Sequence, residues 1–168
     1  MIEIQNLSKS FGENLVWENV SFNISDGETL AIIGKSGCGK SVLLKHLNAL
    51  LYPDQGEVVI DGHKLFELSY AELRKIRQKF GILFQGGALF DSINTFENVA
   101  FPLRYFTDLD EPEIRKKVEK ALEMVNLVGS GDKPTSALSG GMRKRVGLAR
   151  AIILEPEYVL YDEPTSGL

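Results

Sequence analysis

One segment near the N-terminus carries the side chains of a phosphate-binding loop. Its sequence is Gly34-Lys35-Ser36-Gly37-Cys38-Gly39-Lys40-Ser41, which fits G-x-x-x-x-G-K-[ST] at every fixed position. The glycines let the backbone curl so that its N–H groups point inward at phosphate oxygens. Lys40 can reach the β- and γ-phosphates of a nucleoside triphosphate, and the Ser41 hydroxyl is a ligand for Mg²⁺. The segment predicts a nucleotide site in which Cys38 is a small spacer; an incidental Gly-rich turn is the alternative.

Two acidic residues follow an apolar run near the end of the chain. The run is Tyr158-Val159-Leu160-Tyr161, and Asp162 and Glu163 come directly after it. Beside a phosphate loop, Asp162 can hold Mg²⁺, directly or through water, and Glu163 can polarise the attacking water as general base. Because adjacent residues on a strand point to opposite faces, the two carboxylates are expected to have different roles. Without the phosphate loop, the same residues would be more typical of a solvated turn.

A third segment with chemical potential is a polar cap followed by two glycines. It reads Leu138-Ser139-Gly140-Gly141-Met142-Arg143-Lys144-Arg145. A capped helix N-terminus is a second anion site, although simple helix capping is the alternative. Since one phosphate loop already serves one nucleotide, this site implies a second nucleotide or the nucleotide of a partner. Two chains arranged head-to-tail with twofold symmetry would complete both sites.

The residues around these segments predict an α/β fold that positions them. Apolar alternation or continuous apolar runs predict strands over residues 2–7, 20–24, 29–33, 56–62, 80–84 and 158–161. Helical spacing predicts helices over residues 40–51, 70–79, 95–105, 111–127 and 139–154. The run 29–33 comes directly before the phosphate loop and is expected to be a strand buried on both faces of a parallel sheet. Strand-rich blocks thus flank a helical insertion, as in an α/β class with a helical subdomain.

The composition excludes several classes of protein. The chain has 168 residues, 43% of them hydrophobic, and a net charge of −4, which argues against a general nucleic-acid-binding surface. A single cysteine rules out an intrachain disulfide. No apolar run reaches the length of about 18 residues that a membrane span needs, and the N-terminus lacks a signal pattern. We therefore expect a cytoplasmic protein whose membrane role, if any, comes through a partner.

Together these segments resemble the ABC ATPase family, and the resemblance covers the whole chain. The family's motifs occur in its order: the phosphate loop at 34–41, a Q-loop glutamine at Gln85, the signature at 138–141, Asp162-Glu163, and the start of a D-loop at Ser166-Gly167-Leu168. The resemblance implies a P-loop NTPase fold, with a RecA-like core, an antiparallel β subdomain and an inserted α-helical signature subdomain. It implies one incomplete nucleotide-binding domain over 1–168, with core and β subdomain in 1–85 and 156–168 and the helical subdomain in 86–155.

The same resemblance implies roles for further residues. Phe11 would stack on adenine, with a core aromatic at a strand end as the alternative. Gln85 would contact Mg²⁺ or the attacking water and sense a transmembrane partner. Three residues would bind the γ-phosphate of ATP held by the second subunit of a head-to-tail dimer: Ser139, Gly140 and Gly141.

The sequence departs from the family pattern in two places. The fifth signature position is Met142 rather than the commoner glutamine. The chain also ends before the D-loop aspartate and the switch histidine, and neither His46 nor His63 stands at that histidine's place. Both histidines are expected to be structural or exposed.

A narrower resemblance is to the ATPases of the Mla/Mce phospholipid transporters, also known for organic solvent and toluene tolerance. It rests on residues 84–92, 96–104 and 138–145, and it makes Met142 expected. It implies a permease and an MCE lipid-binding protein as partners, a phospholipid or other hydrophobic substrate, and a place at the cytoplasmic face of the membrane. The alternatives are a non-transport ABC ATPase of DNA repair, chromosome or translation type, or a nucleotide-binding fragment without turnover.

Aromatic residues gather after the glutamine, and basic residues follow the signature. The aromatic residues form the core of the helical subdomain, line a groove for a helix of the permease, or do both; they are Phe90, Phe96, Phe101, Tyr105 and Phe106. The basic residues are expected mainly on a solvated or packing face, with a contact to phosphate or to the permease as the alternative; they are Arg143, Lys144, Arg145 and Arg150.

Overall fold

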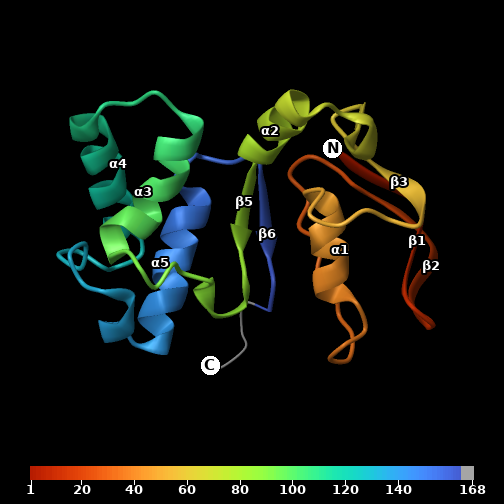
Figure 1. The fold of residues 1–168 in the computed structure, drawn as a ribbon, viewed down its shortest axis with the longest axis horizontal. Helices are drawn as coiled ribbons and strands as arrows, with labels where there is room; N and C mark the ends of the chain where they lie inside the picture. The colour runs from red at the N-terminus through yellow and green to blue at the C-terminus, as the bar shows by residue number, and fades with distance from the viewer. Residues whose placement is uncertain (164–168) are drawn as a thin grey trace. The chain divides into compact units, whose positions relative to one another are not determined.

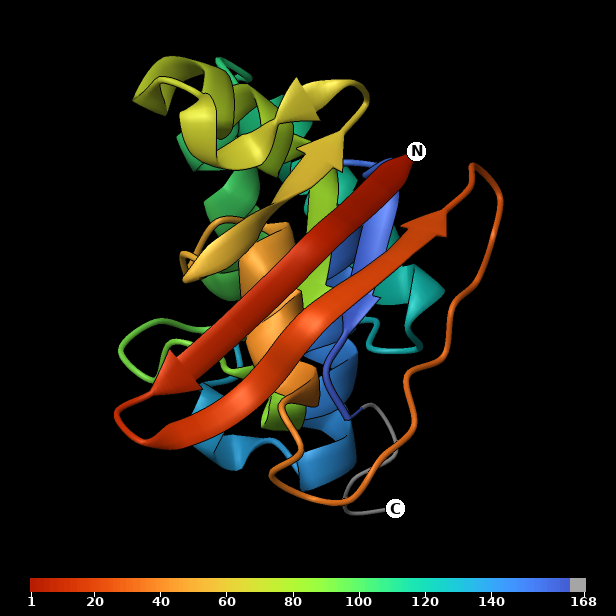
Figure 2. The same ribbon diagram turned by 90° about the vertical axis from the view of Figure 1, so that its right-hand side faces the viewer.

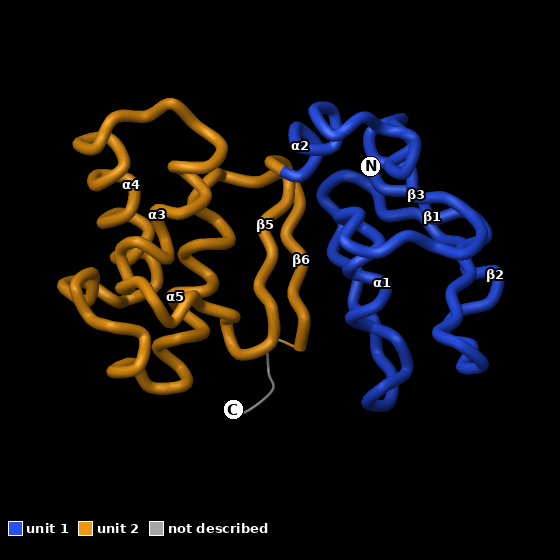
Figure 3. The backbone as a smooth tube through the Cα atoms, in the orientation of Figure 1, with its two compact units in different colours: residues 1–77 blue, residues 78–168 orange. Residues whose placement is uncertain are grey.

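The computed structural model describes residues 1–163, and the chain forms two compact units (Figures 1 and 3). The first unit is Met1–Arg77 and the second is Gln78–Leu168. The predicted subdomain bounds of 1–85 with 156–168, and of 86–155, stay a prediction. The D-loop segment at 166–168 lies outside the described residues.

The first unit is built on a four-stranded antiparallel sheet in the order β2-β1-β3-β4 (Figure 2). Its strands are β1 (Ile2–Phe11), β2 (Asn14–Ile24), β3 (Gln55–Ile60) and β4 (His63–Lys64). The helices are α1 (Lys40–Leu47) and α2 (Tyr70–Gln78), with a short 3₁₀ turn, η1 (Leu65–Glu67), between β4 and α2. A turn at Gly12, with φ of 59°, joins β1 to β2.

The interior of the first unit includes apolar residues of β1, β3 and α1. Ile2 and Ile4 obey strand alternation, but Leu7 breaks it and is nevertheless fully buried. The reason is a β-bulge, because Asn6 has a φ of 51° and the pairing with β2 shifts between Ile4 and Leu7. The predicted helix over 40–51 is shorter in the structure, since α1 ends at Leu47 and Ala49 has a left-handed backbone.

The predicted strand over residues 29–33 is wrong. Residues 28–35 have no regular structure, and Ile33 keeps 94% of its surface exposed. Figure 2 shows this stretch as part of the coil between β2 and α1. A buried parallel strand requires neighbours that take up its backbone hydrogen bonds. Within residues 1–163, the one parallel pair is β5–β6 of the second unit, so this apolar run has no ladder.

The second unit combines a short parallel sheet with three helices. The strands β5 (Phe80–Leu83) and β6 (Tyr158–Tyr161) pair in parallel, with Leu83 opposite Tyr161. The helices are α3 (Thr95–Phe106), α4 (Glu111–Met124) and α5 (Gly140–Ile152), and the 3₁₀ turns are η2 (Gln85–Gly87) and η3 (Thr135–Ala137). These bounds confirm the helices predicted over 95–105, 111–127 and 139–154 to within a few residues.

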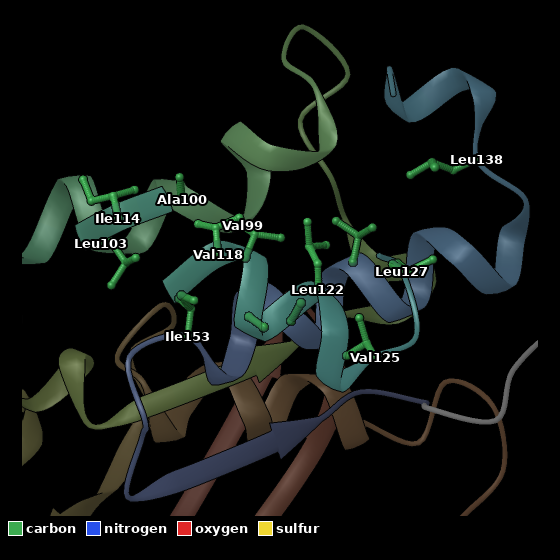
Figure 4. Packing of buried hydrophobic residues seen from close by; sticks show 13 residues of the cluster. Val99, Ala100, Leu103, Ile114, Val118, Leu122, Val125, Leu127, Leu138 and Ile153 are labelled. Atoms are coloured by element: carbon green, nitrogen blue, oxygen red, sulfur yellow. The ribbon is translucent and has the colours of Figure 1, made fainter. Parts of the chain in front are cut away.

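The three helices share one hydrophobic core (Figure 4). Val99 and Leu103 of α3, Val118 of α4 and Val146 of α5 are all nearly or fully buried in it. Side-chain caps start the helices: Asn94 accepts from the Glu97 amide, Asp110 forms a capping box with Glu113, and Ser139 accepts from the Met142 amide. Within residues 1–163, no helix has both the length and the apolar character needed to cross a bilayer.

Candidate nucleotide site

The predicted phosphate loop is an irregular segment that ends at the start of α1. Gly37 and Gly39 have φ values of 78° and 96°, which glycine adopts without steric cost. Gly39 is the residue before the first turn of α1, and Lys40 is the first residue of the helix. The Lys40 ammonium donates to the carbonyls of Gly34 and Lys35, each at 3.1 Å, so the charge is held over the loop. A triphosphate would meet this ammonium and the N-terminus of α1 together.

The loop is supported from β2. A Cβ on Gly39 would lie 2.5 Å from Cγ1 of Val16 and 3.1 Å from the Trp17 ring. The close approach therefore requires glycine for space as well as for its positive φ. This contact fixes the end of the loop against the sheet of the first unit.

Phe11 is the last residue of β1 and keeps 48% of its surface exposed. It is therefore outside the buried core, so the alternative of a core aromatic is wrong. The β1–β2 register pairs Lys9 with Trp17, the residue that contacts Gly39, and Phe11 comes two residues after Lys9. Phe11 thus lies on the strand that runs beside the support of the phosphate loop. Its role toward adenine stays a prediction.

In the second unit, Gln85 and the two acids meet at one edge of the parallel sheet. Gln85 begins η2 just after β5, while Asp162 and Glu163 follow β6. The Asp162 amide donates to the Leu83 carbonyl at 2.9 Å, which extends the ladder by one bond. The carboxyl ends of these two strands therefore bring the predicted catalytic and metal-binding residues of this unit together.

The expectation that Asp162 and Glu163 point to opposite faces of a strand is wrong. β6 ends at Tyr161, so Asp162 and Glu163 lie in a bend and not on the strand. Glu163 has a φ of 49°, so strand alternation does not set the direction of its side chain. Within residues 1–163, no three His, Cys, Asp or Glu side chains form a metal cluster. Mg²⁺ is commonly held by one or two carboxylates plus phosphate oxygens, and Asp162 provides a carboxylate of this kind; the ligand set of Ser41, Gln85 and Asp162 stays a prediction.

The signature residues stand at the exposed N-terminus of α5. Ser139, Gly140 and Gly141 are at this end of the helix, both glycines are exposed, and Ser139 Oγ accepts from the Met142 amide at 3.2 Å. Capping therefore accounts for the serine. It does not account for the glycines, because among the described residues outside the helix's own nearby backbone no atom lies within 4 Å of a Cβ built on either one. Met142 packs against the helical core, which explains an apolar side chain at this position.

Sequence reasoning missed the residues that hold the Gln85 turn. Gly87 has a φ of 86°, and a Cβ there would lie 2.7 Å from the Arg143 carbonyl of α5. Arg150, expected on a solvated or packing face, is partly buried and donates to the Gly87 carbonyl at 2.7 Å. Asn98 is fully buried; it accepts from the Phe90 amide at 2.8 Å and donates to the Phe90 carbonyl at 3.0 Å. The sequence feature that could have identified Asn98 is its amide side chain, which stands on the apolar face of a predicted helix.

The two histidines have different surroundings. His46 is fully buried, with Nδ1 2.7 Å from the Val42 carbonyl, and burial lowers the pKa of its imidazole. His63 is exposed in β4. Both outcomes confirm the expectation of structural or exposed histidines.

The aromatic cluster divides into a buried part and an exposed part. Phe96 packs against the helical core. Phe90, Phe101 and Tyr105 keep 44%, 45% and 46% of their surfaces exposed. Phe101 contacts both of the others, with ring centroids 4.9 Å from Phe90 and 6.3 Å from Tyr105. The interpretation as a core ring therefore holds for Phe96, and three rings lie at the surface, where a groove for a helix of the permease stays a prediction.

Comparisons with known proteins agree with these motifs. Residues 17–166 match the ABC transporter family. The chain is 51% identical over 167 residues to the probable ribonucleotide transport ATP-binding protein mkl of Mycobacterium leprae, covering 99% of the chain and 48% of that protein. It is 40% identical over 167 residues to the intermembrane phospholipid transport system ATP-binding protein MlaF of Escherichia coli K12, covering 99% and 62%. The chain thus spans about half the length of the mycobacterial relative.

Solved structures give the same result. A dimeric bacterial ABC transporter cassette, MJ0796, matches with a TM-score of 0.92 at 37% identity, over 100% of this chain and 76% of that one. A dimer of the same cassette in a post-hydrolysis state, bound to ADP and Pi, matches with a TM-score of 0.91 at 36% identity, with the same coverage. The fold is therefore the predicted α/β fold of a P-loop NTPase cassette. The chain belongs to the ABC transporter family.

Proposed function

We propose that the chain provides the ATP-binding and ATP-hydrolysing site of an ABC transporter subunit. The observation that supports this most directly is the phosphate loop, in which Lys40 lies over the carbonyls of Gly34 and Lys35 at the start of α1. In this proposal the loop residues 34–41 bind the phosphates of ATP, and Phe11 stacks on adenine. A match to a cassette solved with ADP and Pi supports the choice of nucleotide.

The catalytic roles follow from the chemistry of the side chains. Glu163 takes a proton from the attacking water, and Gln85 orients that water. Lys40 stabilises negative charge on the phosphates as the bond to the γ-phosphate breaks. Ser41, Gln85 and Asp162 would hold Mg²⁺, which neutralises phosphate charge when it is bound.

A second copy of the subunit completes the site through its signature. Glycine in a helix is less stable than alanine by about 0.8–1.0 kcal/mol, and no described contact within the chain requires Gly140 or Gly141. Exposed backbone at a helix N-terminus is what a closely approaching phosphate needs. Ser139, Gly140 and Gly141 would therefore bind the γ-phosphate held by the partner, in a head-to-tail dimer. The dimeric cassette structures support this arrangement.

The transport partner and substrate are inferred from relatives and from the exposed aromatic rings. A membrane permease would seat a helix against Phe90, Phe101 and Tyr105, which keeps the subunit at the cytoplasmic face of the membrane. The MlaF proteins, at 40% and 45% identity, are named for intermembrane phospholipid transport and favour a phospholipid substrate. The resemblance to the Mla/Mce ATPases adds an MCE lipid-binding protein as a further proposed partner. Ribonucleotide transport is the second candidate, because the mycobacterial relatives named for it are 51% identical.

Replacing the proposed base tests hydrolysis. In the complete subunit with its permease, Glu163→Gln is expected to bind ATP as the wild type does and to lower turnover by about a hundredfold or more. Lys40→Ala is expected to weaken ATP binding, measured by calorimetry. Turnover near the wild-type rate in Glu163→Gln would remove Glu163 from the role of base. Unchanged affinity in Lys40→Ala would contradict the phosphate loop.

Reconstitution tests the substrate. The subunit and its permease, in vesicles, should move a fluorescent phospholipid in an ATP-dependent manner and leave labelled ribonucleotides where they are. Glu163→Gln is the matched control for coupling. Movement of ribonucleotides alone would favour the second candidate. Co-purification with DNA or ribosomes and not with a permease would favour the non-transport ATPases.

A further inference from the structure

One face of the Phe11 ring is already occupied by a cation. Lys9 Nζ lies over the ring, 5.4 Å from its centroid, within the distance of about 6 Å at which cation–π attraction operates. The Lys9 side chain keeps only 13% of its surface exposed. Phe11 keeps 48% of its own surface exposed, so about half of its surface stays open beside this cation.

Asp54 holds the lysine in this position. Its Oδ1 accepts from Lys9 Nζ at 2.7 Å, and its Oδ2 accepts from the Ser10 amide at 2.7 Å. Its own amide donates to the Ser8 carbonyl at 2.9 Å, so one aspartate binds three successive residues of β1. These contacts keep the pKa of the Asp54 carboxyl below its usual range, because the ammonium and the amide both favour the charged form. The cation is therefore fixed to the strand that carries Phe11.

The same strand position is connected to the phosphate loop. Lys9 pairs across the sheet with Trp17, and Trp17 contacts Gly39. The cation and the ring thus lie on the strand that pairs with the residue supporting the end of the loop, all within one unit.

We propose that Lys9, held by Asp54, is a positioning residue for the nucleotide base: it backs the Phe11 ring and leaves one face for a purine. The inference rests on the proposed role of Phe11 toward adenine. An exposed ring that is held in place loses less conformational freedom when a base stacks on it. The π face of a ring is negative, so a cation on one face reduces its repulsion with the electron-rich face of adenine on the other.

The test separates binding of the base from binding of the phosphates. In the complete subunit, affinities are measured by calorimetry with Mg²⁺ present, for ATP and for inorganic tripolyphosphate, which lacks the base. Lys9→Met is expected to weaken ATP binding about 2- to 10-fold and to leave tripolyphosphate binding unchanged. Lys9→Arg keeps a cation over the ring and should restore ATP binding. Lys64→Met is the matched control, because Lys64 also pairs with a carboxylate of this sheet, Glu57 at 2.9 Å, and should change neither affinity.

The unchanged tripolyphosphate affinity also shows that the Lys9 variant is folded. Equal weakening for both ligands would mean that Lys9 acts on the loop or the phosphates, and it would overturn the inference. No weakening for either ligand would overturn it as well. A Phe11→Leu variant that binds ATP like the wild type would remove the stacking role and the inference together. A wild type that binds neither ligand would instead refute the proposed function itself.

Discussion

Replacing Gly141 by alanine should make the subunit more stable and less active. Gly141 is the second residue of α5, and no atom lies within 4 Å of the position that an alanine Cβ would take, so the new methyl group meets no clash within the described residues. Alanine in place of a helical glycine gains about 0.5–1 kcal/mol, because the unfolded chain has fewer conformations to lose. For a chain of this size, that gain raises the Tm by about 1–4 °C. Thermal unfolding without nucleotide measures it.

Turnover should change in the opposite direction. The same methyl group would stand between the helix N-terminus and the partner's γ-phosphate, and a displacement of about 1 Å at a reacting centre can lower the rate by about a hundredfold. Steady-state ATP hydrolysis by the complete transporter measures this loss. A lower Tm would show that the glycine serves the fold of a single chain. A higher Tm with full turnover would show that no partner approaches this surface closely.

Gly147→Ala is the control on the same helix. A Cβ at this position would lie 2.9 Å from the Gly87 Cα and 3.0 Å from a methyl group of Leu83. The substitution overpacks the contact between α5 and the Gln85 turn, and we expect it to destabilise the fold by about 1–3 kcal/mol. Both substitutions replace glycine by alanine on one helix. If one stabilises the fold and the other destabilises it, the difference comes from the surroundings alone.

Three further predictions concern buried polar side chains. Asn98→Ala leaves the Phe90 amide and carbonyl without their partner and should lower the free energy of unfolding by about 2–4 kcal/mol; a loss below about 1 kcal/mol in urea would contradict this. Arg150→Met removes the bond to the Gly87 carbonyl, so turnover should fall while ATP affinity stays constant, and equal changes in both would argue for general unfolding. Burial holds the pKa of His46 below its ordinary 6.5, so the unfolded chain binds the extra proton first and stability falls as the pH drops below about 6.5. His46→Leu should lose less stability than the wild type between pH 7.5 and 5.5, and identical pH profiles would show that other groups cause the loss.

The parts of the fold that depend on neighbouring residues were predictable from the sequence. The helix predicted over 111–127 begins at Glu111 as expected, where Asp110 and Glu113, three residues apart, form a capping box. The phosphate loop was equally predictable, since its glycines and Lys40 act within one short segment. In both cases the determining contacts join residues only a few positions apart.

The regular patterns failed where burial depends on distant residues and where a single residue leaves the regular backbone. The run 29–33 is as apolar as a buried strand, but its burial depends on neighbouring strands that its own sequence does not specify. Strand alternation predicts that Leu7 faces away from Ile2 and Ile4, and a single left-handed residue, Asn6, reverses that direction. Periodicity depends only on the spacing of residues along the chain, so it does not reveal a β-bulge.

The residues that would touch the nucleotide are recognisable from their own sequence segments, whereas the residues that hold them in place act through contacts between distant positions. Lys40, Gln85 and Glu163 were recognisable because phosphate and water chemistry restricts their types. Trp17 supports the loop at Gly39, which is 22 positions away in sequence. Arg150 supports the Gln85 turn at Gly87, which is 63 positions away. Many side chains can fill a packing role, so residue type alone does not reveal it. A variant at a supporting position should therefore change the rate of hydrolysis through geometry, whereas a variant at Glu163 should remove the proposed general base itself.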